Sequence, residues 1–416
     1  MYYAKEDIPK SCKIEKSIEY MTYLTILLFY TGKVFEVITF LIDILFISLL
    51  VIRKEKLFFE QHKKLIISFG ILLLYFAVQS LFANNIKVAL VNSLGMVRFI
   101  ILFFALWYIF NTQEKVKKLI YSIFIVLSIL FLDASYQYIT GKDIFGYPLY
   151  QNIRLTCWSN MPKLSGSIAI FTGVLFASFL ILKKKKMPVL ITIFLMLMMF
   201  FAGNRGPIVY LVGAVFIVLL FSKYRKYLFY AVFGFGIIVT VIFTMNDKLY
   251  EHFSVYKNPM NAKNNAGRTP IYKVGIEMIK EHPFLGVGSK NFRYDFKTYH
   301  LKTYDPQIDN NEYDEIYSKK TPLHVHSIFL SFLLNWGTIG SLIFFYILYQ
   351  IYKNHIRHNE IAILTSIGLV YCIAPFNFGK SIAQGQWQFY IFLTLAFVVI
   401  LGSYNKLKEE RKECIS

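Results

Sequence analysis

Two histidines at the start of an apolar run are the residues of this 416-residue chain best suited to acid–base chemistry. His324 and His326 follow Pro322 and precede an apolar run that begins at Ile328. A neutral imidazole accepts a proton near physiological pH, which suits a general base that activates a hydroxyl. Two other interpretations stay open: a polar cluster at the start of a helix, and a His-x-His metal site, for which we find no carboxylate at metal-ligand spacing.

Arginines at the ends of two other segments suit the binding of an anion. Arg205 stands in a short turn, Asn204–Pro207, between two apolar runs, and Arg268 precedes a predicted helix. The planar guanidinium binds phosphate oxygens in pairs, and the N-terminus of a helix favours an anion. For Arg205, the alternative is an extended side chain that reaches lipid phosphate at the interface.

Three more cations are candidate substrate-binding residues. Arg154 and Lys380 lie in loops that the topology described below assigns to the same side as the two arginines. Arg98 lies inside the apolar run 92–111, where a charge normally faces the interior of the bundle or a watery cavity. An ion pair, for example with Asp133, and a contact with a ligand both fit this position.

The elements that must position these residues are membrane-spanning helices. The chain is 56% hydrophobic and 18% aromatic, and its apolar runs repeatedly reach about 17–25 residues, the length of a span. The net charge of +20 indicates basic cytoplasmic loops, under the positive-inside rule, rather than a nucleic-acid partner. We predict an all-α polytopic membrane protein with both termini inside and about twelve spans: 17–32, 34–52, 65–83, 92–111, 119–139, 164–182, 188–203, 207–222, 227–245, 326–351, 361–376 and 388–404.

This topology divides the chain into three parts. Residues 1–245 hold about nine N-terminal spans, and residues 326–416 hold about three more and a cytoplasmic tail. The long polar segment 246–325 lies between them on the opposite side of the membrane. Because unpaired backbone groups are costly in hydrocarbon, we expect it to form a partly helical cap over the bundle.

Two stretches of the predicted cap have a recognisable character. Thr269–Lys280 is predicted to be a short helix, because Pro270 suits its first turn and an apolar face recurs along it. The acidic, tyrosine-rich run Asp305–Tyr317 suits either a face that contacts sugars or a solvated loop.

Several short motifs follow one another in a characteristic order along residues 130–345. They are Tyr136–Gly146, Arg154–Thr156, Gly203–Pro207, Gly267–Tyr272, Glu281–Phe292 and His326–Gly340. In their order and topology they resemble the O-antigen ligase and polymerase superfamily. Ser327 is a departure, because many members have Asn after the histidine.

The resemblance implies a GT-C-type glycosyltransferase of the bacterial inner membrane whose active site faces the periplasm. It implies that Arg205 and Arg268 bind the diphosphate of an undecaprenyl-diphosphate-linked glycan and that His326 is catalytic, without metal, nucleotide or other cofactor. The implied partners are this glycan donor, a lipid A–core acceptor and membrane lipid. His324 is a further candidate substrate-binding residue, together with Arg98, Arg154 and Lys380.

Three functions stay open. The favoured one is a ligase that passes the glycan to the outer core sugar of lipid A–core. A polymerase would add the same donor to another lipid-linked repeat. A transporter or flippase is a non-enzymatic alternative, but we find no internal repeat of the kind that many transporters carry.

Overall fold

The computed structural model describes residues 7–29, 34–151, 154–158, 164–182, 199, 202–203, 205–227, 233, 236, 240, 244, 268–303, 321–375, 377 and 380–407. Within these ranges the regular elements are helices, apart from two isolated β-bridges, Lys142–Pro148 and Tyr150–Arg154. The predicted all-α class is confirmed.

The helices overlap the predicted apolar runs, although those at Asp7–Leu28 and Lys56–Ser80 begin ten and nine residues before the predicted spans 17–32 and 65–83. The bounds are α1 (Asp7–Leu28), α2 (Val34–Arg53), α3 (Lys56–Ser80), α4 (Ile86–Leu94), α5 (Val97–Ile109), α6 (Gln113–Thr140), α7 (Leu164–Ala169), α8 (Thr172–Leu182), α10 (Arg205–Leu220), η1 (Lys223–Tyr227), α13 (Arg268–Glu281), α14 (Phe292–Thr303), α16 (Ile328–Ile351), η3 (Tyr352–Ile356), α17 (Glu360–Ile373) and α18 (Gly385–Gly402).

Among the described residues, seven helices are long and apolar enough to cross a membrane. They are Val34–Arg53, Lys56–Ser80, Ile86–Ile109, Gln113–Thr140, Leu164–Leu182, Ile328–Ile356 and Gly385–Leu407. Two shorter apolar helices are Gly206–Leu220 and Glu360–Ile373. The predicted spans 188–203 and 227–245 fall mostly outside the described residues, so the number twelve stays a prediction.

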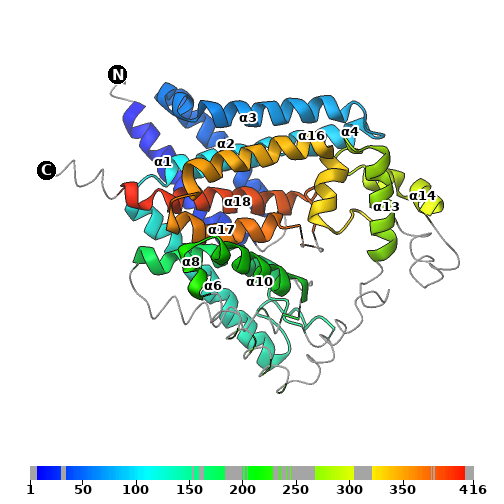
Figure 1. The fold of residues 1–416 in the computed structure, drawn as a ribbon. Coiled ribbons are helices and arrows are strands. Elements are labelled where there is room, and N and C mark those ends of the chain that lie inside the picture. The colour runs from blue at the N-terminus through cyan, green and yellow to red at the C-terminus, as the bar shows by residue number, and fades with distance from the viewer. Residues whose placement is uncertain are drawn as a thin grey trace.

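α18 lies at the centre of the bundle (Figure 1). Every residue from Trp387 to Gly402 is buried, and the helix packs against α17, α5 and α8. A helix that is apolar on all faces is expected where protein surrounds it completely. α18 is therefore the core element against which the other helices are placed.

Polar contacts tie four helices together at one end of the bundle. Glu15 of α1 pairs with Arg53 of α2 at 2.6 Å and with Lys115 of α6 at 2.5 Å. Arg53 also donates to the hydroxyl of Tyr108 in α5 at 2.9 Å. The basic-loop pattern predicts this end to be cytoplasmic; α13, α14 and α4 lie at the opposite end (Figure 1).

α16 is broken at Gly337, so that its first turns point in a different direction from the rest (Figure 1). Gly337 has φ 64° and ψ −177°, in a region that favours glycine. The loop before α14 fills the break and satisfies the backbone groups that the helix leaves free. The exchanged bonds are Thr338 N–H to Pro283 O (2.9 Å), Ile339 N–H to Phe284 O (3.2 Å) and Val287 N–H to Leu334 O (2.8 Å).

Two side chains of α3 complete this junction. The amide of Gln79 donates to the carbonyl oxygens of Leu285 at 2.5 Å and Asn335 at 2.6 Å. The hydroxyl of Tyr75 donates to the carbonyl oxygen of Trp336 at 2.5 Å. The first turns of α16, which follow the two histidines, are thus fixed by both α3 and the loop.

Candidate functional site

The histidine segment is held by a small hydrophobic cluster between α13, α14 and α16. The predicted helix Thr269–Lys280 is confirmed as α13, and its apolar face is buried. Val325, between the two histidines, is fully buried in the same cluster. The other members are Ile271, Val274, Met278, Val287, Phe292, Phe296, Tyr299 and Leu334.

His326 has a strained backbone and an unpaired ring nitrogen. Its φ is +52°, in the left-handed region, which costs an L-residue about 1–2 kcal/mol. Such strain concentrates at functional sites. Nδ1 of His326 is buried and has no hydrogen-bond partner among the described residues, a condition that costs about 1–3 kcal/mol. Nδ1 of His326 is therefore available to a bound substrate.

Neighbouring residues fix the backbone on both sides of this ring. The hydroxyl of Tyr272 in α13 donates to the carbonyl oxygen of His326 at 3.4 Å. The hydroxyl of Ser327 accepts from the N–H of Leu330 at 3.4 Å and so caps α16. Many members of the family that the chain resembles have Asn at the position of Ser327. In this chain the serine is the N-cap of α16.

His324 lies against the ring of His326. The two ring centroids are 4.1 Å apart, with an interplanar angle of 40°. The side-chain N–H of Gln384 donates to Nε2 of His324 at 3.1 Å. With this assignment, Nε2 is the acceptor and the ring proton lies on Nδ1.

Two predicted cations set the electrostatics of the pair. Burial, with the charges of Lys380 and Arg268, lowers the pKa of His324 to about 4. Burial, then His324, Arg268 and Lys380, lowers the pKa of His326 to about 3. Both imidazoles are therefore neutral at neutral pH, which leaves a lone pair available on each ring.

Each of these cations lies beside an aromatic residue. Lys380 lies over the ring of Trp387, with Nζ 5.4 Å from the ring centroid. Burial raises the pKa of Tyr272, and the neighbouring Arg268, four residues earlier in α13, opposes that shift. The arrangement places two positive charges beside the imidazoles.

A buried polar network attaches the chain around Lys380 to the start of α16. The hydroxyls of Ser331 and Ser381 are 2.6 Å apart, and the N–H of Ile382 donates to the Ser331 hydroxyl at 3.0 Å. The N–H of Ile328 donates to the carbonyl oxygen of Asn377 at 2.9 Å. Gln384 and the two histidines are thus positioned by one network.

Arg154 packs at the turn that leads into α10. A Cβ built on Gly203 would lie 2.7 Å from Cγ of Arg154, so the arginine occupies the space that only a glycine leaves free. The guanidinium carbon of Arg154 is 5.8 Å from the ring centroid of Tyr150. Arg205 is the first residue of α10, two positions after this glycine; its side chain lies outside the described part of the structure.

Arg98 forms an ion pair, and its partner is Glu36 rather than the Asp133 considered from the sequence. The Arg98 Nη1 to Glu36 Oε2 distance is 3.1 Å. Asp133 instead accepts from the N–H of Ile144 at 2.8 Å. Arg98 Nη2 would lie 3.3 Å from a Cβ on Gly385, so this pair packs directly behind Gln384. Sequence could not identify Glu36, which lies 62 positions from Arg98.

The structure therefore brings together four of the seven predicted residues: His324, His326, Arg268 and Lys380. It also adds two residues that sequence reasoning missed. Tyr272 shares a face of α13 with Arg268, a signal that the i, i+4 spacing offered. Gln384 had no such signal, because it is one of several polar residues in a loop before α18.

These residues can take a proton from a substrate hydroxyl while an anionic group of the substrate lies beside it. His326 presents a ring nitrogen that has no partner among the described residues, and Arg268 and Lys380 present positive charge. Among the described residues, no group of three or more His, Cys, Asp or Glu side chains is placed to hold a metal ion. The tyrosine-rich run Asp305–Tyr317 lies outside the described residues.

Residues 188–345 match the family described as O-antigen ligase. The matched range includes Arg205, Arg268 and both histidines, whereas Lys380 and Gln384 lie beyond it. This match confirms the resemblance to the O-antigen ligase-like superfamily and supports an O-antigen ligase- or polymerase-type function. With the apolar helices, it marks the chain as a membrane protein. The comparison with curated proteins gives no match.

Proposed function

We propose that this protein is a glycosyltransferase that moves a glycan from undecaprenyl diphosphate to the outer core sugar of lipid A–core. The reaction would take place on the periplasmic side of the inner membrane, under a cap formed by residues 246–325. The observation that carries the proposal is the unpaired Nδ1 of His326 beside Arg268 and Lys380.

The acceptor hydroxyl donates to Nδ1 of His326 and attacks the anomeric carbon of the glycan. A new carbon–oxygen bond forms while the bond to the diphosphate breaks, and the diphosphate leaves with the electron pair. The hydroxyl proton passes to His326, and Arg205 and Arg268 stabilise the charge on the leaving group. No step needs a metal or nucleotide.

Donor binding is expected to activate the base. A pKa of about 3 makes His326 a weak base, because burial first, and then His324, Arg268 and Lys380, oppose its protonation. A diphosphate bound to these cations offsets their charge and so raises the pKa of His326. Proton transfer then becomes effective when the leaving group is in place.

The other candidates have supporting roles in this proposal. His324, held by Gln384, orients the acceptor or the ring of His326. Lys380 and Arg154 contact the donor phosphates or the glycan. Arg98 lies next to Gly385, and its ion pair with Glu36 holds the neighbouring Gln384 in position.

The lipopolysaccharide of a deletion strain tests this proposal. We expect bare core, with lipid-linked polymer accumulating in the inner membrane. Core that carries a single repeat would instead identify the polymerase, which uses the same donor and the same catalytic residues. A normal lipopolysaccharide profile would contradict both functions.

A further inference from the structure

A cavity lies at the opposite end of α16 from the two histidines. His326 precedes the first residue of α16, and the cavity is lined by residues at its end and in η3. The part of α16 after the break, Thr338–Ile351, has 14 residues and is about 21 Å long, so the two places are well separated. The cavity has a volume of about 290 Å³.

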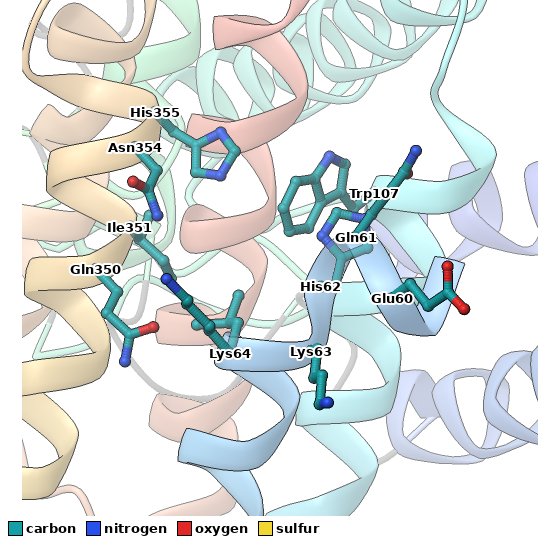
Figure 2. A pocket seen from close by; sticks show the side chains of 11 residues that line it. Glu60, Gln61, His62, Lys63, Lys64, Trp107, Gln350, Ile351, Asn354 and His355 are labelled. Carbon is teal, nitrogen blue, oxygen red and sulfur yellow. The ribbon is translucent and has the colours of Figure 1, made fainter. Parts of the chain in front are cut away.

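Three aromatic rings form one wall of the cavity (Figure 2). The ring of His62 in α3 lies 4.1 Å from that of Trp107 in α5, centroid to centroid. The ring of His355 in η3 lies 5.0 Å from Trp107, at an interplanar angle of 88°. Leu65 and Ile351 are buried and line the cavity with Trp107.

The remaining lining is polar and consists of two lysines, one glutamate and three amide side chains. Lys63 and Lys64 are exposed, and the amides of Gln61, Gln350 and Asn354 also line the cavity. Figure 2 shows Lys64 extending toward Ile351 and Gln350, whereas the carboxylate of Glu60 points the other way. The amines, imidazoles and amides offer hydrogen-bond donors to one anion.

The backbone around His355 is also unusual. η3 is a π-helical turn, closed by a hydrogen bond of 2.9 Å from the N–H of Arg357 to the carbonyl oxygen of Tyr352. Such turns inside α-helices occur frequently at functional sites. Here the wider turn carries Asn354 and His355, both of which line the cavity.

We propose that this cavity binds a phosphate group, and that its natural ligand is the headgroup of an acidic phospholipid. Lysine ammonium groups suit phosphate, and basic pockets between transmembrane helices bind anionic headgroups. The volume lies at the lower end of small-molecule pockets, of about 300–1,000 Å³, which fits a headgroup rather than a whole nucleotide. Trp107 and Ile351 supply an apolar surface for the adjoining glycerol and acyl carbons.

Tryptophan fluorescence of the purified full-length protein provides a direct test. The protein in detergent is titrated with dihexanoyl phosphatidic acid and, separately, with dihexanoyl phosphatidylcholine. We expect saturable binding of phosphatidic acid alone, and a signal that disappears in Trp107→Phe, although three other tryptophans remain. Native mass spectrometry counts the bound lipid independently of fluorescence.

Matched variants then separate this cavity from the general basic surface. Lys63→Gln with Lys64→Gln should raise the Kd for phosphatidic acid about 25-fold, since each lysine near the surface contributes about fivefold. Lys353→Gln, an exposed lysine of η3 outside the cavity, should leave the Kd unchanged. Glu60→Gln should tighten binding.

Competition with inorganic phosphate distinguishes a lipid headgroup from free phosphate as the source of the anion. Competition by phosphate would show that the anion alone is recognised, and binding of phosphatidic acid without competition would assign the site to the lipid. Equal binding of the two lipids by both methods would overturn the proposal. So would a double lysine variant that binds phosphatidic acid as the unaltered protein does.

Discussion

A Cβ added to Gly275 would lie 2.6 Å from Cγ2 of Val325. Gly275 is in α13, and Val325 separates the two histidines of the candidate site. The absence of a side chain at this one position lets α13 press directly on the His324–His326 segment. α13 thereby determines where the His324–His326 segment lies.

Gly275→Ala should therefore impair catalysis while leaving the protein folded. The added methyl displaces Val325, and a shift of about 1 Å at the adjacent histidine costs about 100-fold in rate. Initial rates of glycan transfer by the purified variant measure this loss.

A second substitution shows whether the contact is the cause. Gly275→Ala with Val325→Ala removes the clash and should recover part of the lost rate, which a double-mutant cycle quantifies. Gly70→Ala, in α3 where nothing lies within 4 Å of the new methyl, should keep the normal rate. Additive losses in the double variant would contradict the explanation.

Gly337→Ala should destabilise the whole protein rather than the site alone. Its methyl would collide with the carbonyl of Phe284, and the residue needs φ 64°. We expect a loss of about 2–5 kcal/mol from strain and overpacking together. Thermal unfolding in detergent checks this, with Gly70→Ala again as the control; an unchanged Tm would argue against the broken helix.

The pH dependence of transfer should differ between free enzyme and complex. The lowered pKa keeps His326 unprotonated in the free enzyme until the pH falls toward about 3, so kcat/KM should hold far into the acid range. The bound diphosphate raises that pKa, so kcat should begin to fall at a higher pH. Initial rates from about pH 3 to pH 8 provide both profiles.

His282→Gln is a suitable control for this pH experiment. His282 contacts Tyr299 on the cap, away from the two imidazoles, and its replacement should move neither profile. A kcat profile whose acidic limb coincides with that of kcat/KM would show that donor binding does not change the base.

Lysine at Arg205 or Arg268 should lower activity although the charge is kept. A bidentate arginine–phosphate contact depends on the planar fork, which an ammonium group cannot reproduce. Transfer rates at matched protein levels measure the effect, and Arg293→Lys, an exposed arginine of α14, is the control. Full activity in Arg205→Ala or Arg268→Ala would remove the basis for the diphosphate site.

Local patterns predicted the helices well. The stretch Thr269–Lys280 has a proline at its first turn and one apolar face, and the structure gives α13 there with one more residue at each end. The predicted spans 34–52 and 326–351 agree with α2 and α16 within two residues. The length of an apolar run and the capping residues at its ends are local properties, so they can be recognised directly in the sequence.

The arrangement of the site depends on contacts between distant residues, which one sequence does not reveal. The break in α16 lies inside an unbroken apolar run, and its backbone partners are in the loop Pro283–Val287. Gln384 reaches His324 from 60 positions away, and no periodicity marks it. In contrast, His326 and Arg268 were identified because the resemblance names residue types at the ends of elements.

Transfer by His326→Ala, compared with His324→Ala, tests the central claim most directly. Purified variants are given the lipid-linked glycan and lipid A–core, with donor binding measured in parallel. We predict that His326→Ala loses about 10²–10⁴-fold in rate with donor binding largely intact, that His324→Ala loses less, and that EDTA changes neither wild-type rate nor binding. Near-normal transfer by His326→Ala, or activity lost in EDTA and restored by a divalent cation, would contradict His326 as the general base.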